Sequence, residues 1–190
     1  MVSQQRLAAD ERSQIYWFLS DCFTHTPSLA SSIDIAKALQ LSAEKLDILA
    51  LQKEFTRLFR GIQEGYGPPP PYESLYRSAE FPSDIVEAVF SYFQTAGFDA
   101  AEICDDPVDY LSSELRLMGL LAYKEHQYQQ QGDNEQASLY RNLQQQFLQN
   151  HLMVWLPEYC EMLAEASREE YYQSLAHYLS NFLIELQKAD

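Results

Sequence analysis

The chain has 190 residues, of which 46% are hydrophobic and 22% charged, so it is too rich in apolar side chains to be wholly disordered. It carries 28 acidic side chains against 13 lysines and arginines, and the net charge of −15 disfavours nucleic acids and anionic membranes as partners. This length fits one domain of ordinary size, so we expect a single domain over residues 1–190.

Glycine and proline, the residues that most often interrupt helices, are few and unevenly placed. Half of the 6 glycines and half of the 8 prolines lie between Gly61 and Pro71. The remaining chain is rich in Leu, Ala, Gln and Glu, which favour helices, and it has no strand-like alternation flanked by hairpin turns. We therefore predict an all-α fold with a Gly/Pro-rich hinge loop at about residues 61–71.

In the N-terminal half, the spacing of apolar residues predicts helices over about residues 3–22 and 29–39. Ser42 is the expected N-cap of a third helix, which ends before the hinge loop. Ser83 is the expected N-cap of a fourth helix, and Gly97 is expected to end it as a C′ residue.

The longest predicted helix follows in the C-terminal half. Asp106 is its expected N-cap, Pro107 suits its first position, and Gly132 is expected to end it. The next predicted helix begins at Asn134 and extends until Pro157 breaks or kinks it.

The last helix is expected to begin at a capping box, because Ser167 and Glu170 have the Ser-x-x-Glu spacing. The sequence shows no clear internal repeat and no clear domain boundary. The hinge loop leaves a monomer and a domain-swapped dimer open as alternatives.

The sequence predicts a cytoplasmic protein that is not inserted in a membrane. No apolar run approaches the roughly 20 residues that span a bilayer, and the first residues lack the apolar core of a signal peptide. The three cysteines are odd in number and widely spaced, which is typical of reduced thiols: Cys22, Cys104 and Cys160.

Familiar catalytic and metal-binding patterns are absent from the sequence. None of the four histidines belongs to a His-Glu-x-x-His or Glu-x-x-His pattern, and the glycines of the hinge loop lack the Lys-Ser/Thr of a P-loop. We therefore expect no enzymatic activity, no cofactor and no bound metal. A small hydrolase or a nucleotide-binding protein stays open as an alternative.

Two segments are suited to a peptide ligand. Four prolines, Pro68–Pro71, hold the backbone extended beside Tyr72 and Tyr76, whose rings suit a ligand-contacting rim. A plain loop between helices and a polyproline ligand for another domain are the alternatives for this segment.

Residues 97–115 contain six acidic side chains and no Lys or Arg, an imbalance that suits a guanidinium-bearing partner. Capping of the long helix is the alternative for two of these carboxylates.

A third segment holds His151 and Trp155, which are four residues apart and so can lie on one face of a helix. Core packing is the plainer interpretation of such an aromatic pair.

Together these segments resemble the TorD/DmsD family of chaperones that mature molybdenum-cofactor redox enzymes. The order comprises Glu-Phe-x-x-Leu-Phe-x-Gly at 54–61, Tyr-Glu-Ser-x-Tyr at 72–76, Pro-x-Asp at 107–109, and His-Leu-x-x-Trp-Leu-Pro at 151–157. The resemblance runs from about residue 54 to residue 159. It implies an all-α, TorD-like fold and a cytoplasmic chaperone that binds the twin-arginine signal peptide of a molybdenum-cofactor oxidoreductase before export.

The resemblance also implies a set of site residues. The peptide-binding positions are Tyr72, Glu73, Ser74, Tyr76, Pro107, Asp109, Tyr110 and Glu114, with His151 and Trp155 in supporting roles. The family has His where this chain has Tyr110, and a tyrosine can donate a hydrogen bond but does not become cationic near neutral pH.

The expected mechanism is binding without bond making. Carboxylates, Asp109 first, are expected to engage the two arginines, while aromatic and leucine side chains take the apolar part of the signal peptide. The mature part of the same enzyme is a second expected partner. A helical adaptor or assembly protein without signal-peptide recognition is the alternative function.

Overall fold

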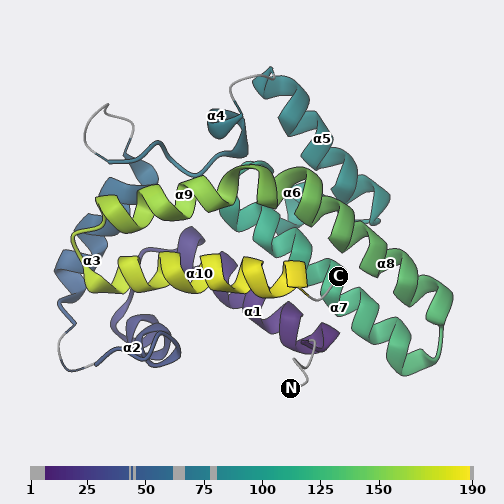
Figure 1. Ribbon diagram of the computed structural model, residues 1–190, viewed down its shortest axis with the longest axis horizontal. Coiled ribbons are helices and arrows are strands. Elements are labelled where there is room, and N and C mark those ends of the chain that lie inside the picture. Colours follow the sequence, from purple (N-terminus) through teal and green to yellow (C-terminus); the bar gives the residue numbers. More distant parts are fainter. Residues whose placement is uncertain (1–6, 43, 45, 62–66, 78–80, 189–190) are drawn as a thin grey trace.

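The computed structural model describes residues 7–42, 44, 46–61, 67–77 and 81–188 (Figure 1). Regular structure in these residues is helical, with one isolated β-bridge, which confirms the predicted all-α class. The first residues of the predicted 3–22 helix and the middle of the predicted hinge loop, residues 62–66, lie outside the described part. A single domain over residues 1–190 stays a prediction.

The helices follow one another closely along the chain. Their bounds are α1 (Ala9–Thr24), α2 (Leu29–Ala38), α3 (Ile48–Phe55), α4 (Glu73–Tyr76), α5 (Pro82–Thr95), α6 (Ala100–Ile103), α7 (Leu111–Gln131), α8 (Asn134–Phe147), α9 (Met153–Ala166) and α10 (Glu170–Lys188). Two π-helical turns extend α3 and precede α9: η2 (Thr56–Arg60) and η3 (Leu148–Leu152).

Helices α1 and α7 pack closely at the centre of the molecule, and α8 packs on α7. Gly119 of α7 allows the close approach, since a Cβ atom there would overlap Cδ1 of the Trp17 ring. Ser13 of α1 donates a hydrogen bond to the carbonyl of Gly119 at 3.0 Å. Helix α10 runs beside α9 and closes the core from the other side (Figure 1).

Several predicted helix ends are confirmed. Gly97 and Gly132 both have φ of 76°, the left-handed conformation that ends a helix. Helix α2 spans nearly the predicted range, and α8 begins at the predicted Asn134.

The predicted start of the longest helix is wrong. Helix α7 begins at Leu111, and its N-cap is Tyr110 rather than Asp106. The Asp106 carboxylate accepts hydrogen bonds from Arg60 and Ser112 instead of capping backbone N–H groups. An aspartate accepts from whichever donor lies nearest, and here the fold places side-chain donors there.

Three other predicted N-caps are also wrong. Helix α3 begins at Ile48, where Asp47 accepts a hydrogen bond from Ala50 N–H, so Ser42 is not the N-cap of this helix. Helix α5 begins at Pro82, which leaves Ser83 inside its first turn. Ser167 is the C-cap of α9 and donates to the carbonyl of Leu163, so it does not form a capping box with Glu170.

The predicted break at Pro157 is displaced toward the N-terminus. Helix α9 continues through Pro157, and the irregular turn is η3, which ends five residues earlier. Proline has no N–H, and its ring crowds the carbonyl four residues before it, which here belongs to Met153, the first residue of α9. The π-helical turn lies directly before that carbonyl.

Candidate functional site

The Pro-rich segment and the acidic segment meet through backbone pairing. Tyr72 and Tyr110 form an antiparallel β-bridge. Glu73 N–H donates to the carbonyl of Asp109 at 2.8 Å, and Leu111 N–H donates to the carbonyl of Pro71 at 2.9 Å. Two stretches nearly forty residues apart in sequence are therefore fixed against each other at the start of α7.

Gly61 and Gly67, the two described glycines of the predicted hinge loop, serve a close backbone contact. A Cβ atom at Gly61 or at Gly67 would lie 2.8 Å from the carbonyl oxygen of Arg57, the second residue of η2. Side chains at these positions would collide with backbone, which cannot move away easily. The described ends of the loop therefore both rest on the same turn of η2.

Tyr110 is fully buried at this junction. Its ring packs edge-on against Tyr72 with centroids 4.9 Å apart, and its hydroxyl donates to the carbonyl of Phe59 at 3.2 Å. Burial raises the pKa of Tyr110, so the phenol stays protonated and remains a donor. Where the resemblance places a histidine, this chain has a neutral structural hydrogen bond.

Arg60 lies over the outer face of this ring. Its guanidinium carbon is 4.8 Å from the centroid of Tyr110 and 5.9 Å from that of Phe55. The guanidinium makes a bidentate ion pair with Asp106, at 2.7 and 3.2 Å, and donates to the carbonyl of Thr24 at 3.0 Å.

Asp109 is buried under α4. Its carboxylate accepts a hydrogen bond of 2.6 Å from Ser74, and only 3% of the residue is exposed. An arginine can reach this buried carboxylate only if the groups that cover it move. Contact between Asp109 and a peptide therefore stays a prediction.

Glu73 is the centre of a buried ionic group. Its carboxylate lies 2.8 Å from Nδ1 of His151 and accepts a hydrogen bond of 2.6 Å from Arg77. Burial acts to raise the pKa of Glu73, but hydrogen bonds with His151, Glu114 and Arg77 outweigh it and lower that pKa. Glu73 is thus ionised although it is completely buried.

Glu114 lies beside Glu73 and has the opposite tendency. Complete burial and the neighbouring charges of Glu73 and Asp109 raise its pKa well above the usual range. Protonation allows Glu114 to donate to the neighbouring Glu73 carboxylate, and Trp155 Nε1 donates to Oε2 of Glu114 at 3.3 Å. The two carboxyl groups share this interior because only one of them is charged.

Both residues of the predicted pair contact α4: His151 contacts its first residue, Glu73, and Trp155 contacts its last residue, Tyr76. His151 sits on the π-helical turn η3, stacked on Phe147 with centroids 4.6 Å apart, and faces Glu73. Trp155 stacks on Tyr76 with centroids 5.3 Å apart. The π-helical turn precedes α9, and such turns are frequent at functional sites.

The predicted site residues therefore assemble in one place, but most of them are interior. The buried ones are Glu73, Asp109, Tyr110, Glu114, His151 and Trp155. Tyr72, Ser74 and Tyr76 are half-buried, and Pro107 is exposed. The carboxylates predicted as a guanidinium-binding set are largely engaged within the protein.

Sequence reasoning missed two exposed apolar side chains next to the stacked pair of Tyr76 and Trp155. Leu75 and Val154, the chain neighbours of the stacked Tyr76 and Trp155, are 54% and 52% exposed. Tyr76 donates to the carbonyl of Pro69 at 2.6 Å, and its burial together with the nearby charge of Glu158 raises its pKa.

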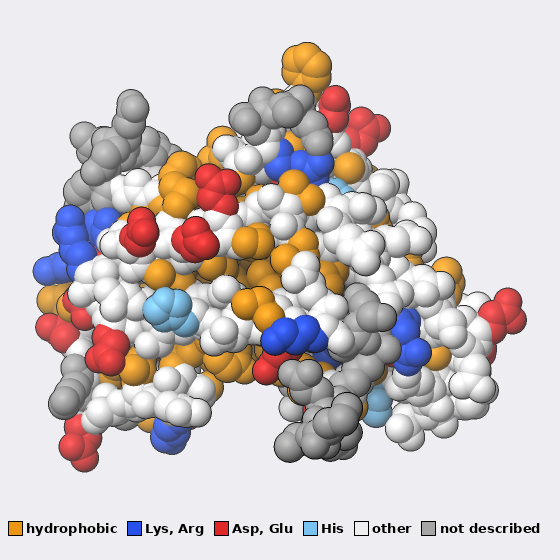
Figure 2. All heavy atoms as spheres, viewed as in Figure 1, with side chains coloured by type: hydrophobic (Ala, Val, Ile, Leu, Met, Phe, Trp, Pro, Cys, Tyr) orange, Lys and Arg blue, Asp and Glu red, His pale blue; other side chains and the backbone are white. Residues whose placement is uncertain are grey.

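Acidic side chains continue this surface along α9 (Figure 2). The three glutamates of α9 are all exposed: Glu158, Glu161 and Glu165. These glutamates recur every three or four residues, between the buried residues of the helix. That spacing is visible in the sequence and could have predicted an exposed acidic face on α9. We call Leu75, Tyr76, Val154 and Glu158 the α4/α9 surface.

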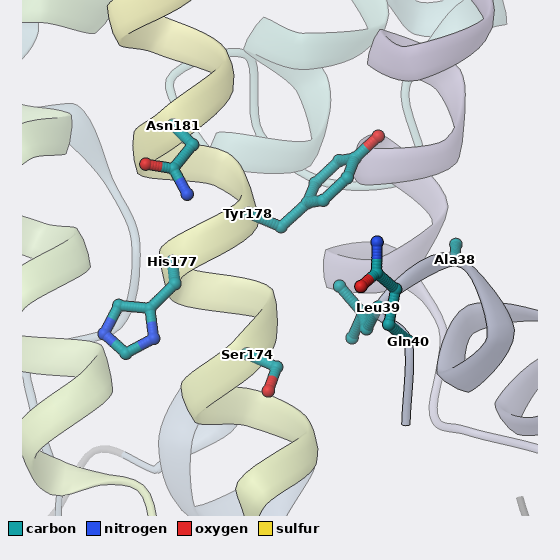
Figure 3. A pocket seen from close by; sticks show the side chains of 7 residues that line it. All are labelled: Ala38, Leu39, Gln40, Ser174, His177, Tyr178 and Asn181. Atoms are coloured by element: carbon teal, nitrogen blue, oxygen red, sulfur yellow. The ribbon is translucent and has the colours of Figure 1, made fainter. Parts of the chain in front are cut away.

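An open cleft lies elsewhere, between α10 and the C-terminal end of α2 (Figure 3). It has a volume of about 270 Å³ and contains none of the predicted site residues. Its lining residues are Ala38, Leu39, Gln40, Ser174, His177, Tyr178 and Asn181.

Two absences concern only the described part of the chain. No helix there is both long and apolar enough to cross a bilayer. In the same residues, no group of three or more His, Cys, Asp or Glu side chains is placed to hold a metal ion.

Comparison with known proteins gives a consistent result. Residues 26–161 match the family described as nitrate reductase delta subunit. The chaperone protein TorD of Aliivibrio salmonicida is 24% identical, with 92% of each chain covered, and that of Vibrio parahaemolyticus is 26% identical, with 91% of each covered. A crystal structure of a proposed redox enzyme maturation protein from Archaeoglobus fulgidus has the same fold, with a TM-score of 0.56 and 20% identity over 91% of this chain and 93% of that one.

Proposed function

Because this chain belongs to the nitrate reductase delta subunit family and is similar to TorD chaperones over most of its length, we propose that it is a maturation chaperone. Its client is a molybdenum-cofactor oxidoreductase, and it binds the twin-arginine signal peptide of that enzyme in the cytoplasm. Binding holds the precursor until the cofactor has been inserted. The mature part of the client is a second contact.

The observation that carries this proposal is the α4/α9 surface. Val154 and Glu158 are exposed one turn apart on α9, and the charge of Glu158 acts on Tyr76, the chain neighbour of the exposed Leu75. A signal peptide joins a basic segment to an apolar one, so it needs both kinds of contact next to each other. Exposed ion pairs contribute only about 0–1 kcal/mol, so apolar contact supplies much of the affinity and charge supplies selectivity.

The buried residues of the site position this surface. Three buried carboxyl groups hold α4 in place. Asp109 accepts from Ser74, Glu73 contacts His151, and Glu114 of α7 accepts from Trp155 of α9. These contacts position the peptide-contacting side chains. The accessible residues that can contact the peptide directly are Tyr72, Ser74, Tyr76 and Pro107. The buried ring of Tyr110 packs against that of Tyr72.

Calorimetry with a synthetic twin-arginine signal peptide tests the proposal. Glu158→Lys should weaken binding about fivefold to tenfold, because it replaces an attraction by a repulsion beside the apolar contact. Glu185→Lys makes the same change in net charge at an exposed position on α10 and should have a smaller effect. A peptide with both arginines replaced by glutamine should bind more weakly than the original.

The adaptor alternative gives a different result. If no twin-arginine peptide binds the wild-type protein, signal-peptide recognition is excluded. Affinity capture from an extract of cells would then recover other partners in place of a redox-enzyme precursor.

A further inference from the structure

Arg60 is held by groups that together form a cage for a guanidinium. Asp106 pairs with it in a bidentate manner, the carbonyl of Thr24 accepts a third hydrogen bond, and the ring of Tyr110 covers one face. Bidentate pairing and aromatic stacking are the two interactions that distinguish arginine from lysine. The carbonyl of Thr24 also lies at the C-terminal end of α1, where the helix dipole favours a cation.

The cage is fixed by contacts that do not involve Arg60. Ser112 donates to the Asp106 carboxylate at 2.9 Å, and the Ser113 hydroxyl donates to the Asp106 carbonyl at 3.0 Å. Tyr110 is held through its bridge to Tyr72. The carboxylate and the ring are therefore already in place for a guanidinium, whichever residue supplies it.

Arg60 is itself the accessible member of the cage. Its side chain is 34% exposed, whereas that of Arg57, one turn earlier, is 7% exposed and enclosed with Glu54. The Asp106 side chain is only 10% exposed, so solvent reaches this ion pair mainly from the Arg60 side. Arg60 also ends the π-helical turn η2, directly before the Gly/Pro-rich segment.

We propose that Asp106, Tyr110 and the Thr24 carbonyl form an arginine-binding subsite that Arg60 fills in the free protein and vacates when an arginine of the client binds. This rests on the proposed function and adds a regulation of it. The client arginine therefore competes with Arg60 for the subsite. The apparent affinity for the client is the intrinsic affinity multiplied by the fraction of time for which the subsite is free of Arg60. Proteins that present no arginine leave Arg60 in place.

The first test examines the subsite without any signal peptide. Methylguanidinium at millimolar concentration should raise the Tm of Arg60→Ala more than that of wild type, because it refills the emptied cage. The Arg60→Ala/Asp106→Asn double variant should lose this extra rise, and methylammonium should not produce it. Equal responses of wild type and Arg60→Ala to methylguanidinium overturn the proposal.

The second test examines the competition. Arg60→Ala should bind the twin-arginine peptide about threefold to tenfold more tightly than wild type does. Lys188→Ala removes the same charge from an exposed position on α10 and controls for the more acidic protein. Unchanged or weaker peptide binding by Arg60→Ala overturns the competition. Should Arg60→Ala fail to fold, Arg60→Gln serves in both tests.

The two tests separate this inference from the proposed function. If the peptide binds neither wild type nor Arg60→Ala, the proposed function fails and the competition fails with it. Rescue by methylguanidinium alone would then show a guanidinium site without a signal peptide as its ligand, which also overturns the proposal as stated.

Discussion

At the scale of single residues, Glu73 and Glu114 show how burial and partners decide charge. Glu73 has His151 and Arg77 as partners and its pKa is lowered, whereas burial and two neighbouring acids raise the pKa of Glu114. The folded protein therefore holds an ionised carboxylate and a carboxylic acid in contact. Each contributes to stability over a different range of pH.

Glu114→Gln is expected to flatten the pH dependence of stability. An unfolded glutamate titrates at about pH 4.3. Because the pKa of Glu114 is raised in the folded state, its contribution is complete below that pH and is lost as the pH rises toward the folded value. Urea unfolding at pH 5 and at pH 8 should show a larger loss for wild type than for Glu114→Gln. Equal losses would mean that Glu114 is ionised in the folded state.

The lowered pKa of Glu73 acts in the opposite direction. Its contribution is present above about pH 4.3 and is lost as the pH falls through the folded value. The comparison between pH 5 and pH 8 lies above that range, so it separates the contribution of Glu114 from that of Glu73.

Gln40 is the second residue with a local consequence. It has φ of 59° and follows α2, where Leu41 N–H donates to the carbonyl of Ala36 and Gln40 N–H to that of Lys37. This is a Schellman ending, whose left-handed position favours glycine.

Gln40→Gly is expected to raise the free energy of unfolding by about 0.5–1 kcal/mol, because glycine adopts this conformation without strain. Chemical denaturation measures the change. Gln40→Ala is the control, since alanine keeps the Cβ strain and should leave stability close to that of wild type. A less stable Gln40→Gly protein would show that the glutamine side chain itself stabilises the cleft beside α10.

At the scale of helices, the contact between α1 and α7 depends on a missing side chain. Gly119 lets the ring of Trp17 lie against the α7 backbone, and Ser13 donates to the carbonyl of the same glycine. Trp17 also packs against Tyr123 on α7, with centroids 5.6 Å apart. The two helices can thus pack closely because Gly119 has no side chain at their contact.

Gly119→Ala is expected to lower the free energy of unfolding by about 1–3 kcal/mol, because the new methyl group overlaps the Trp17 ring. In an ordinary helix interior the same change stabilises by roughly 0.5–1 kcal/mol. A Trp17→Ala background should therefore reverse the sign of the effect. Destabilisation of equal size in both backgrounds would contradict the proposed clash.

At the scale of the whole molecule, the net charge of −15 surrounds the site with negative potential. Several acids of the 97–115 segment are used internally: Asp99 accepts from Ala101 N–H, Asp106 pairs with Arg60, and Asp109 accepts from Ser74. Attraction of a basic leader therefore depends on exposed carboxylates, including those of α9.

Binding of a twin-arginine peptide is expected to weaken as salt is added. The Debye length falls from about 10 Å at 0.1 M to about 3 Å at 1 M, which removes long-range attraction but leaves apolar contact. We expect the Kd to rise about fivefold to tenfold over this range, as measured by calorimetry. The Glu158→Lys variant should have a shallower dependence. A Kd that does not change with salt would exclude an electrostatic contribution.

The sequence by itself determined most of the longer helices and the family. Apolar residues at helical spacing, few helix breakers, and glycines at positions 97 and 132 act through neighbours three or four residues apart, so they can be read locally. The ordered motifs likewise placed the chain among the chaperone relatives that the comparisons then found. The N-caps were less well determined, since Ser and Asp bind any donor that comes near.

Only the tertiary structure decided what those motif residues do. The bridge between Tyr72 and Tyr110, the burial of Asp109 under Ser74 and the pairing of Arg60 with Asp106 join segments 35 or more residues apart. Residues so distant meet only when the core has packed, and burial then fixes whether a carboxyl group is charged, paired or available. Local spacing contains no information about such long-range contacts. The acidic segment therefore suggested an open binding site, whereas in the folded protein most of the carboxylates predicted to bind a guanidinium are engaged by the protein itself.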